Sequence, residues 1–175
     1  MNFPNVLVVH KAAGAKTLAE FIQLSKKKPG SVEFASTGAG SASHLAGELF
    51  NQRAGIDMTH VPEEPVSGKL IPLATTGLTR PAYLPNIPTV AESGFPGFEA
   101  LNWYAFVAPG KTPAPLLERW NKEIVKVLND PGVKDALNKH GLTPQPTTRA
   151  ELTAFMKKES TQWAAIIKER KLTAD

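Results

Sequence analysis

The sequence predicts an α/β fold in which a mainly parallel sheet is flanked by helices and followed by C-terminal helices. Short apolar runs alternate with amphipathic segments over residues 1–61. Such alternation is typical of strands that are joined by helical crossovers. A loop rich in Ser, Thr and Gly separates one apolar run from the amphipathic segment that follows it. The second half of the chain shows mostly helical periodicity.

Three strands and two helices are predicted in the first part of the chain. Thr17 and Glu20 form a capping box that opens the first helix, and Pro29 ends it. The second helix covers residues 43–54, with Gly55 as its C-terminal cap. The predicted strands are residues 6–9, which form a continuous apolar run typical of a buried strand, and residues 32–35 and 56–61.

The alternating pattern ends after residue 61. Residues 70–75 are strand-like, but Pro72 confines them to a sheet edge or an irregular position. Residues 79–99 contain four prolines and therefore predict a connecting stretch, with one short helical turn at 89–92. Residues 104–108 predict a last strand.

Three helices are predicted to complete the chain. The first covers residues 113–128; Asp130 and Pro131 begin the second, and a capping box from Thr148 to Glu151 opens the third. The residues expected on the inner faces are Leu117, Trp120, Ile124, Val127 and Leu128 of the first helix, and Leu152, Phe155, Met156, Trp163, Ile166 and Ile167 of the last.

Composition and charge exclude several classes of function. The net charge is +4, but the basic residues are spread over the helices without an aromatic-studded basic strand, so we expect solvated faces and no nucleic-acid partner. The absence of cysteine excludes disulfides, thiolate catalysis and cysteine zinc sites. The first residues lack the pattern of a signal peptide, and no run of 18 apolar residues predicts a transmembrane helix.

The loop between the second strand and the second helix is the candidate functional site. Free backbone N–H groups at a helix N-terminus attract anions, glycine permits close approach, and hydroxyl groups add donors. A small anion such as a carboxylate is therefore the expected ligand. The candidate ligand-binding residues are Ser36, Thr37, Gly38, Ala39, Gly40, Ser41, Ser43 and His44.

Other chemistries for this loop are weaker. Gly38 and Gly40 begin a dinucleotide fingerprint, but Ser43 occupies the place of its third glycine. Ser41 or Ser43 as a nucleophile lacks the G-x-S-x-G elbow, and simple helix capping requires only one hydroxyl. His44 and His60 lack metal-ligand spacing, and His44 is expected to make local hydrogen bonds. We therefore expect no metal and no cofactor.

Several separate motifs, in the same order, resemble the solute receptors of tripartite tricarboxylate transporters, also called Bug receptors. The matching segments are residues 4–9, 35–41, 44–50, 54–62, 84–94 and 108–113, with Trp103 and the terminal residues Glu159, Trp163 and Lys168. The resemblance implies a two-lobed periplasmic binding protein that is not an enzyme. It also implies a small carboxylate ligand (a dicarboxylate, a tricarboxylate or an acidic amino acid) and a membrane permease as partner. Residues 36–44 correspond to the ligand loop of the second lobe.

The sequence departs from the family pattern in two places. The first half of a family member, with its own ligand loop, has no counterpart here, and a piece of the second lobe is missing after Pro62. Residues 1–78 then correspond to a shortened second lobe. Residues 79–175 correspond to the connecting segment and helices that complete the first lobe and hinge in the family.

These departures bear on function. A single loop is expected to bind a carboxylate no better than roughly millimolar, because solvated hydrogen bonds contribute only about 1 kcal/mol each. Terminal helices without their covering lobe are expected to expose apolar faces and to favour homo-oligomers. One alternative function is therefore an oligomeric remnant that binds no ligand, and a weaker one is a serine-dependent hydrolase.

Overall fold

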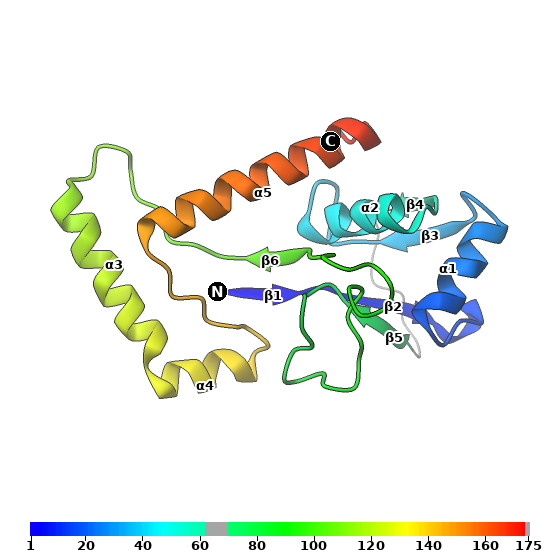
Figure 1. Ribbon diagram of the computed structural model, residues 1–175, viewed down its shortest axis with the longest axis horizontal. Helices are drawn as coiled ribbons and strands as arrows, with labels where there is room; N and C mark the ends of the chain where they lie inside the picture. The colour runs from blue at the N-terminus through cyan, green and yellow to red at the C-terminus, as the bar shows by residue number, and fades with distance from the viewer. Residues whose placement is uncertain (62–69, 174–175) are drawn as a thin grey trace. The chain divides into compact units, whose positions relative to one another are not determined.

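The computed structural model describes residues 1–61 and 70–173, and Figure 1 shows the order of its helices and strands. The strands are β1 (Asn2–Pro4), β2 (Val6–His10), β3 (Val32–Ala35), β4 (Met58–Val61), β5 (Leu70–Thr75) and β6 (Leu101–Trp103). The α-helices are α1 (Leu18–Lys27), α2 (Ala42–Ala54), α3 (Ala114–Asn129), α4 (Pro131–Lys139) and α5 (Arg149–Arg170), and a short 3₁₀ helix covers Lys11–Ala13. This mixture of elements confirms the predicted α/β class.

The chain divides into two compact units. Unit 1 contains Met1–Phe3 and Trp103–Gln162, and unit 2 contains Pro4–Asn102 and Trp163–Asp175. Strands β1 and β6 and helix α5 contribute residues to both units. The division of the chain predicted after residue 78 stays a prediction.

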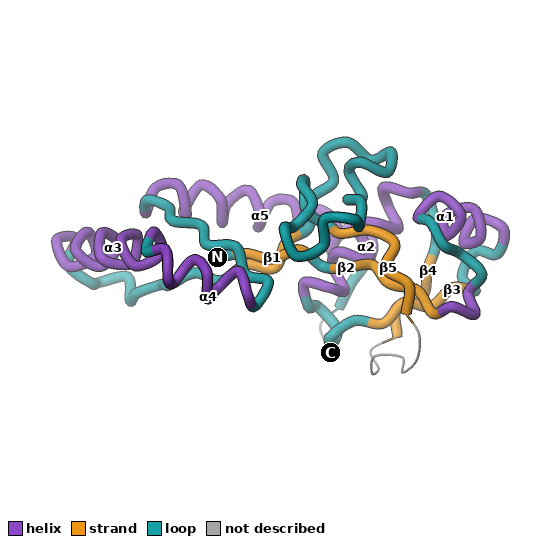
Figure 2. Tube along the Cα trace, turned by 90° about the horizontal axis from the view of Figure 1, so that it is seen from below, coloured by secondary structure: helices purple, strands orange, loops and turns teal. Residues whose placement is uncertain are grey.

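The strands form three two-stranded sheets, which are drawn in orange in Figure 2. Strands β3 and β4 are parallel and are joined through α2, which confirms the predicted crossover unit. Strands β2 and β5 are antiparallel, with an irregularity between Leu7 and Val8 beside the position of Pro72. The expected single, mainly parallel sheet is thus corrected, because apolar runs indicate strands but not which of their edges pair.

Local side-chain caps fix the helix ends of unit 2 close to their predicted places. Thr17 accepts a hydrogen bond from the Glu20 N–H (3.2 Å), while the Glu20 carboxylate accepts from the N–H of Lys16, one residue before the predicted partner. Ser41 caps α2, which therefore begins at Ala42. Gly55 ends α2 with φ at 60°, a left-handed conformation that favours glycine.

The buried core lies in unit 2. The rings of Phe95 and Phe98 pack edge-on against Phe50 of α2, with centroids 6.0 and 6.3 Å apart. The Asn51 side chain both donates to the carbonyl and accepts from the N–H of Met58, so that α2 is tied to β4. The buried hydrophobic residues are Val9, Ala15, Leu18, Phe21, Ala46, Leu49, Phe50, Ala54, Ile56, Met58, Leu73, Ala74, Val90, Phe98, Ala100 and Ile166.

Unit 1 has well-formed helices but no buried residue. The Thr148–Glu151 capping box is confirmed: each side chain accepts a hydrogen bond from the backbone N–H of the other residue, at 2.8 and 3.2 Å. Asp130 caps α4 through the Val133 N–H. Among the residues predicted on the inner faces of α3 and α5, only Ile166 is buried, and it belongs to unit 2. Exposure of the apolar faces of the terminal helices is confirmed.

The predicted helical turn at 89–92 is present: the Ser93 N–H donates to the Thr89 carbonyl at 3.1 Å, and Thr89 and Glu92 cap each other. Two further predictions are corrected. Residues 104–108 form no strand, and Phe106 and Val107 are 72% and 78% exposed, because this apolar run has no neighbouring strand to pair with. Strand β2 is less buried than its composition indicates, since Val8 is 41% exposed.

None of the described helices is long and apolar enough to cross a membrane. The segment predicted to be missing after Pro62 would join residues 62–69, which lie outside the described residues.

Candidate functional site

The predicted ligand loop lies in unit 2, between the end of β3 and the start of α2. Gly38 and Gly40 have φ values of 131° and 71°, which only glycine adopts without strain. A β-carbon on either glycine would meet no atom within 4 Å, so the backbone there faces open space. The loop therefore presents bare backbone at the N-terminus of a helix, as the sequence analysis expected.

The hydroxyl groups of the loop hydrogen-bond mainly to the loop itself. The Ser43 hydroxyl lies 3.1 Å from both the Thr37 and Ser41 hydroxyls and accepts from the Thr37 N–H. The Ser36 hydroxyl accepts from the N–H of Gly38 and donates to its carbonyl. These contacts hold the loop in one shape before any ligand arrives, and they leave fewer hydroxyl donors for a ligand than the composition indicates.

Within residues 39–43, three backbone amides have no hydrogen-bond acceptor among the described residues. They belong to Ala39 in the loop and to Ala42 and Ser43 in the first turn of α2. The amides of Gly38 and Gly40 are already used by the Ser36 hydroxyl and by Nδ1 of His44. The donors open to an anion are thus the three unpaired amides, and the positive end of the helix dipole adds to their attraction.

Two histidine side chains hydrogen-bond to the loop. His44 is buried in α2, where its Nδ1 accepts from the Gly40 N–H at 3.0 Å, which confirms the local role expected for it. Its ring stacks on that of His60, with centroids 3.7 Å apart and planes inclined by 13°. Nε2 of His60 lies 2.7 Å from the Ser36 hydroxyl. The two rings therefore contact both ends of the glycine turn.

His60 was not predicted among the site residues. A signal was available, because residues at the carboxyl ends of adjacent parallel strands lie side by side. His60 is paired in register with Phe34, two residues before Ser36. Only the pairing of β3 with β4, which the sequence does not specify, turns this proximity into a contact.

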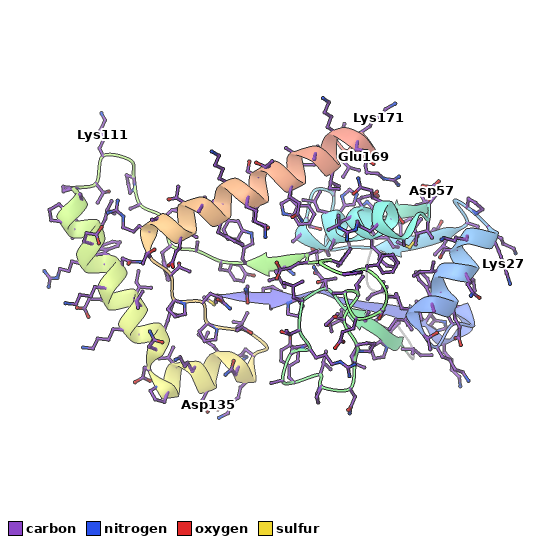
Figure 3. All side chains as sticks on the ribbon, in the orientation of Figure 1. Lys27, Asp57, Lys111, Asp135, Glu169 and Lys171 are labelled. Carbon is purple, nitrogen blue, oxygen red and sulfur yellow. The ribbon has the colours of Figure 1, made fainter. Side chains whose placement is uncertain are left out.

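A partly buried ion pair lies next to the histidines. Glu48 of α2 places Oε1 at 3.9 Å from Nε2 of His44 and accepts from Nε of Arg170 at 2.7 Å. Arg170 also reaches Asp57 at 3.3 Å, and the neighbouring Glu169 accepts a hydrogen bond from Gln52. Figure 3 labels Asp57 and Glu169 in this part of unit 2. The last turn of α5 is thereby tied to the helix that begins at the ligand loop.

The pKa values of His44 and Arg170, on either side of Glu48, shift in opposite directions. Burial lowers the pKa of His44, the nearby His60 lowers it further, and Glu48 opposes both. The hydrogen bond to Glu48 raises the pKa of Arg170. Accepting from the Gly40 N–H requires an unprotonated Nδ1, and the lowered pKa of His44 favours that state.

The geometry disfavours Ser41 and Ser43 as catalytic nucleophiles. Among the described residues, the hydroxyls of Ser41 and Ser43 contact other hydroxyls and backbone N–H groups but no imidazole nitrogen. The histidine contact belongs to Ser36, whose hydroxyl also bonds to Gly38. No group of three or more His, Asp or Glu residues that could hold a metal occurs within residues 1–61 and 70–173.

Comparisons with known proteins identify relatives over nearly the whole chain. The model of the tripartite tricarboxylate transporter family receptor matches residues 1–66 and 65–172. The UPF0065 protein in the tcbD-tcbE intergenic region of Pseudomonas sp. (strain P51) is 32% identical over 200 aligned residues, which cover 98% of this chain and 60% of that protein. Protein BugT of Bordetella pertussis is 30% identical and covers 95% of this chain and 59% of its own length. The chain thus spans about three fifths of the length of these relatives.

Solved structures share the fold. Rpa4515 of R. palustris with adipate superposes with a TM-score of 0.84 at 24% identity, covering 99% of this chain and 67% of that one. A periplasmic transporter gives 0.81 at 27% identity, with the same coverage. MatC of Rhodopseudomonas palustris with bound malate gives 0.75 at 24% identity and covers 95% and 67%. These likenesses confirm the predicted resemblance to periplasmic binding proteins.

Proposed function

This chain belongs to the tripartite tricarboxylate transporter receptor family, and from that premise we propose that it binds a small carboxylate for delivery to a membrane permease. The family is one of solute-binding receptors and not of enzymes. The observation that carries the proposal is the set of unpaired amides at Ala39, Ala42 and Ser43, held in place by a self-bonded hydroxyl loop. Such a cradle fits one carboxylate group.

The related structures support a carboxylate as the ligand class. Two of the proteins with this fold hold adipate and malate, which are both dicarboxylates. We place this chain in the periplasm on the same grounds, since its relatives of known structure are periplasmic proteins. The residues we assign to the ligand are those predicted from the sequence, Ser36–Ser41, Ser43 and His44, with the amides as donors and the histidines as supports.

Calorimetry with adipate, malate, citrate and glutamate tests the proposal. We expect a Kd of roughly a millimolar for at least one of them, since a few solvated hydrogen bonds supply about 4 kcal/mol. A complete lack of heat and of thermal stabilisation at tens of millimolar would contradict it.

One substitution removes a single donor without harming the helix. Ala42 is the first residue of α2, where proline is favoured and its missing N–H costs the helix no hydrogen bond. Ala42→Pro should weaken carboxylate binding about tenfold, the effect of one charge-assisted hydrogen bond. Ala42→Ser keeps the amide and serves as the matched control. Equal affinity of the two variants would exclude the Ala42 amide from the site.

A remnant without ligand binding is the second candidate. Tyr104, Phe106, Val107 and Trp120 of unit 1 are each more than half exposed, and such apolar surface favours self-association. Sedimentation analysis separates the candidates: a concentration-dependent oligomer that ignores all four carboxylates favours the remnant, whereas carboxylate binding in any oligomeric state favours the receptor.

A further inference from the structure

Two strands of unit 2 leave one edge unpaired. Among the described residues, β2 forms a ladder only with β5, and β3 forms one only with β4. Neither β2 nor β3 makes a backbone hydrogen bond on its other side to any described residue. An unpaired strand edge presents a row of N–H and C=O groups that a further strand can pair with.

A cavity of about 410 Å³ lies between these two edges. Its lining includes every residue of β2 and every residue of β3. The cavity is therefore bordered by both strands along their whole length. Phe21, Phe50 and Phe98 also line the cavity, which makes its walls largely apolar.

The chain lacks residues at the corresponding place in the sequence. The family match is split into two segments that meet at residues 65–66, between β4 and β5. The alignment with the Pseudomonas relative spans 200 positions, more than the 175 residues of this chain, so the relative carries additional residues within the matched region. Strand β4 belongs to the sheet on one side of the cavity, and β5 to the sheet on the other.

We propose that the cavity between β2 and β3 is a binding site for one extended, apolar polypeptide strand supplied by another chain. The incoming backbone pairs with the free edges of β2 and β3 and joins the two small sheets of unit 2 into one, which is recognition by β-augmentation. Its apolar side chains pack against the phenylalanines of the cavity wall. The two strand edges supply hydrogen bonds, and the apolar walls select the side chains.

Short overlapping peptides from the Pseudomonas relative, covering the residues it carries opposite the break at 65–66, are the probes. At saturation, one of them should raise the Tm by about 5 °C or more, because a ligand that binds only the folded state stabilises it. The same peptide should slow amide exchange in β2 and β3. The absence of both effects up to millimolar peptide would overturn the proposal.

The matched control is the active peptide with alternate backbone nitrogens methylated, which keeps the side chains but removes one row of donors. Loss of binding supports strand pairing, whereas equal binding would show that the cavity only takes apolar groups and would overturn it. A dimer that the peptide dissociates would assign the cavity to a second copy of this chain and would also overturn it.

An insertion variant of the chain tests the same site without depending on peptide solubility. Inserting the relative's additional residues between positions 65 and 66 supplies the strand within the chain, so it should raise the Tm and abolish peptide binding. An insertion variant that still binds the peptide with unchanged affinity would contradict the proposed site. All of these measurements are made without carboxylate, so their failure is distinguishable from failure of the proposed receptor function.

Discussion

The helices of unit 1 and unit 2 begin with the same kind of capping residue, yet only unit 2 buries apolar side chains in a core. Ser41 caps α2 in unit 2, and Asp130 caps α4 in unit 1, with nearly equal hydrogen-bond lengths of 3.2 and 3.0 Å. All residues of the buried hydrophobic core nevertheless belong to unit 2. The comparison shows that caps define where a helix begins, whereas burial depends on whether another element covers its apolar face.

Their ion pairs differ in the same way. Arg170 in unit 2 bonds to a Glu48 side chain that is 6% exposed, whereas Arg149 in unit 1 bonds to a Glu118 side chain that is 67% exposed. The two pairs have similar lengths, 2.7 and 2.6 Å. Distance therefore does not separate the two pairs, whereas burial does. Figure 3 labels Lys111 and Asp135 as further charged residues of unit 1.

The largest expected effect comes from deleting a ring of the unit 2 core. Phe98 is 1% exposed, so Phe98→Ala should lower the free energy of unfolding by about 3–5 kcal/mol. Trp120→Ala, at a larger but 56% exposed ring of unit 1, should cost less than about 1 kcal/mol. Urea denaturation followed by circular dichroism measures both. Similar losses for the two variants would mean that unit 1 has a core of its own.

The two ion pairs provide the next test. Arg170→Met leaves the buried Glu48 carboxylate without its partner and should cost about 2–3 kcal/mol. Arg149→Met removes an exposed pair and should cost about 0–1 kcal/mol. Denaturation at low and high salt distinguishes them further, because salt screens the exposed pair more strongly. Equal costs for the two substitutions would refute the difference in burial as the cause.

Glycine substitutions compare helix packing in the two units. A β-carbon on Gly47 of α2 would overlap the ring of Phe34, so Gly47→Ala should destabilise unit 2 by about 1–3 kcal/mol despite the better helix propensity of alanine. In α4, a β-carbon on Gly132 approaches only the Asp130 carboxylate, at 3.2 Å. Gly132→Ala should therefore leave the thermal midpoint unchanged or raise it slightly. A stabilising Gly47→Ala would show that Phe34 moves aside without cost.

The smallest effect is expected from pH. The folded-state pKa of His44 is lowered below its usual 6.5, so the unfolded chain takes up the proton first as the pH falls. Stability of unit 2 should thus be unaffected above about pH 7 and should decline as the pH drops through 6.5.

Asn at position 44 offers a carbonyl oxygen near the place of Nδ1 and does not titrate. His44→Asn should therefore flatten the decline in the denaturation midpoint between pH 7 and pH 5 while it keeps the Gly40 contact. An equally steep decline in this variant would assign the pH dependence to another group.

Much of the fold could be predicted because its signals are local. Capping residues such as Thr17, Ser41 and Thr148 lie within a few residues of the groups they bond to, and Gly55 fixes a helix end by its own conformation. Strand pairing joins residues far apart in the chain, such as Val6 with Thr75, and no local pattern specifies it. The expectation of one mainly parallel sheet was wrong for this reason.

The candidate site divides in the same way. The glycine loop before α2 was evident from its composition, whereas its support by His60 required the pairing of β3 with β4. The internal use of the hydroxyls was also hidden, since composition reveals donors but not which of them already have acceptors. Direct assignment of the loop to a ligand stays a prediction for the calorimetry above.

The sequence by itself determined the family, the α/β class, the helix ends and the position of the glycine-rich loop before α2, because each depends on short motifs read along the chain. Only the tertiary structure decided which strand edges pair, which helix faces are buried, and that His44 and His60 stack behind the loop. These features depend on contacts between residues distant in sequence. Their free energy comes from surfaces that meet only after the chain has folded.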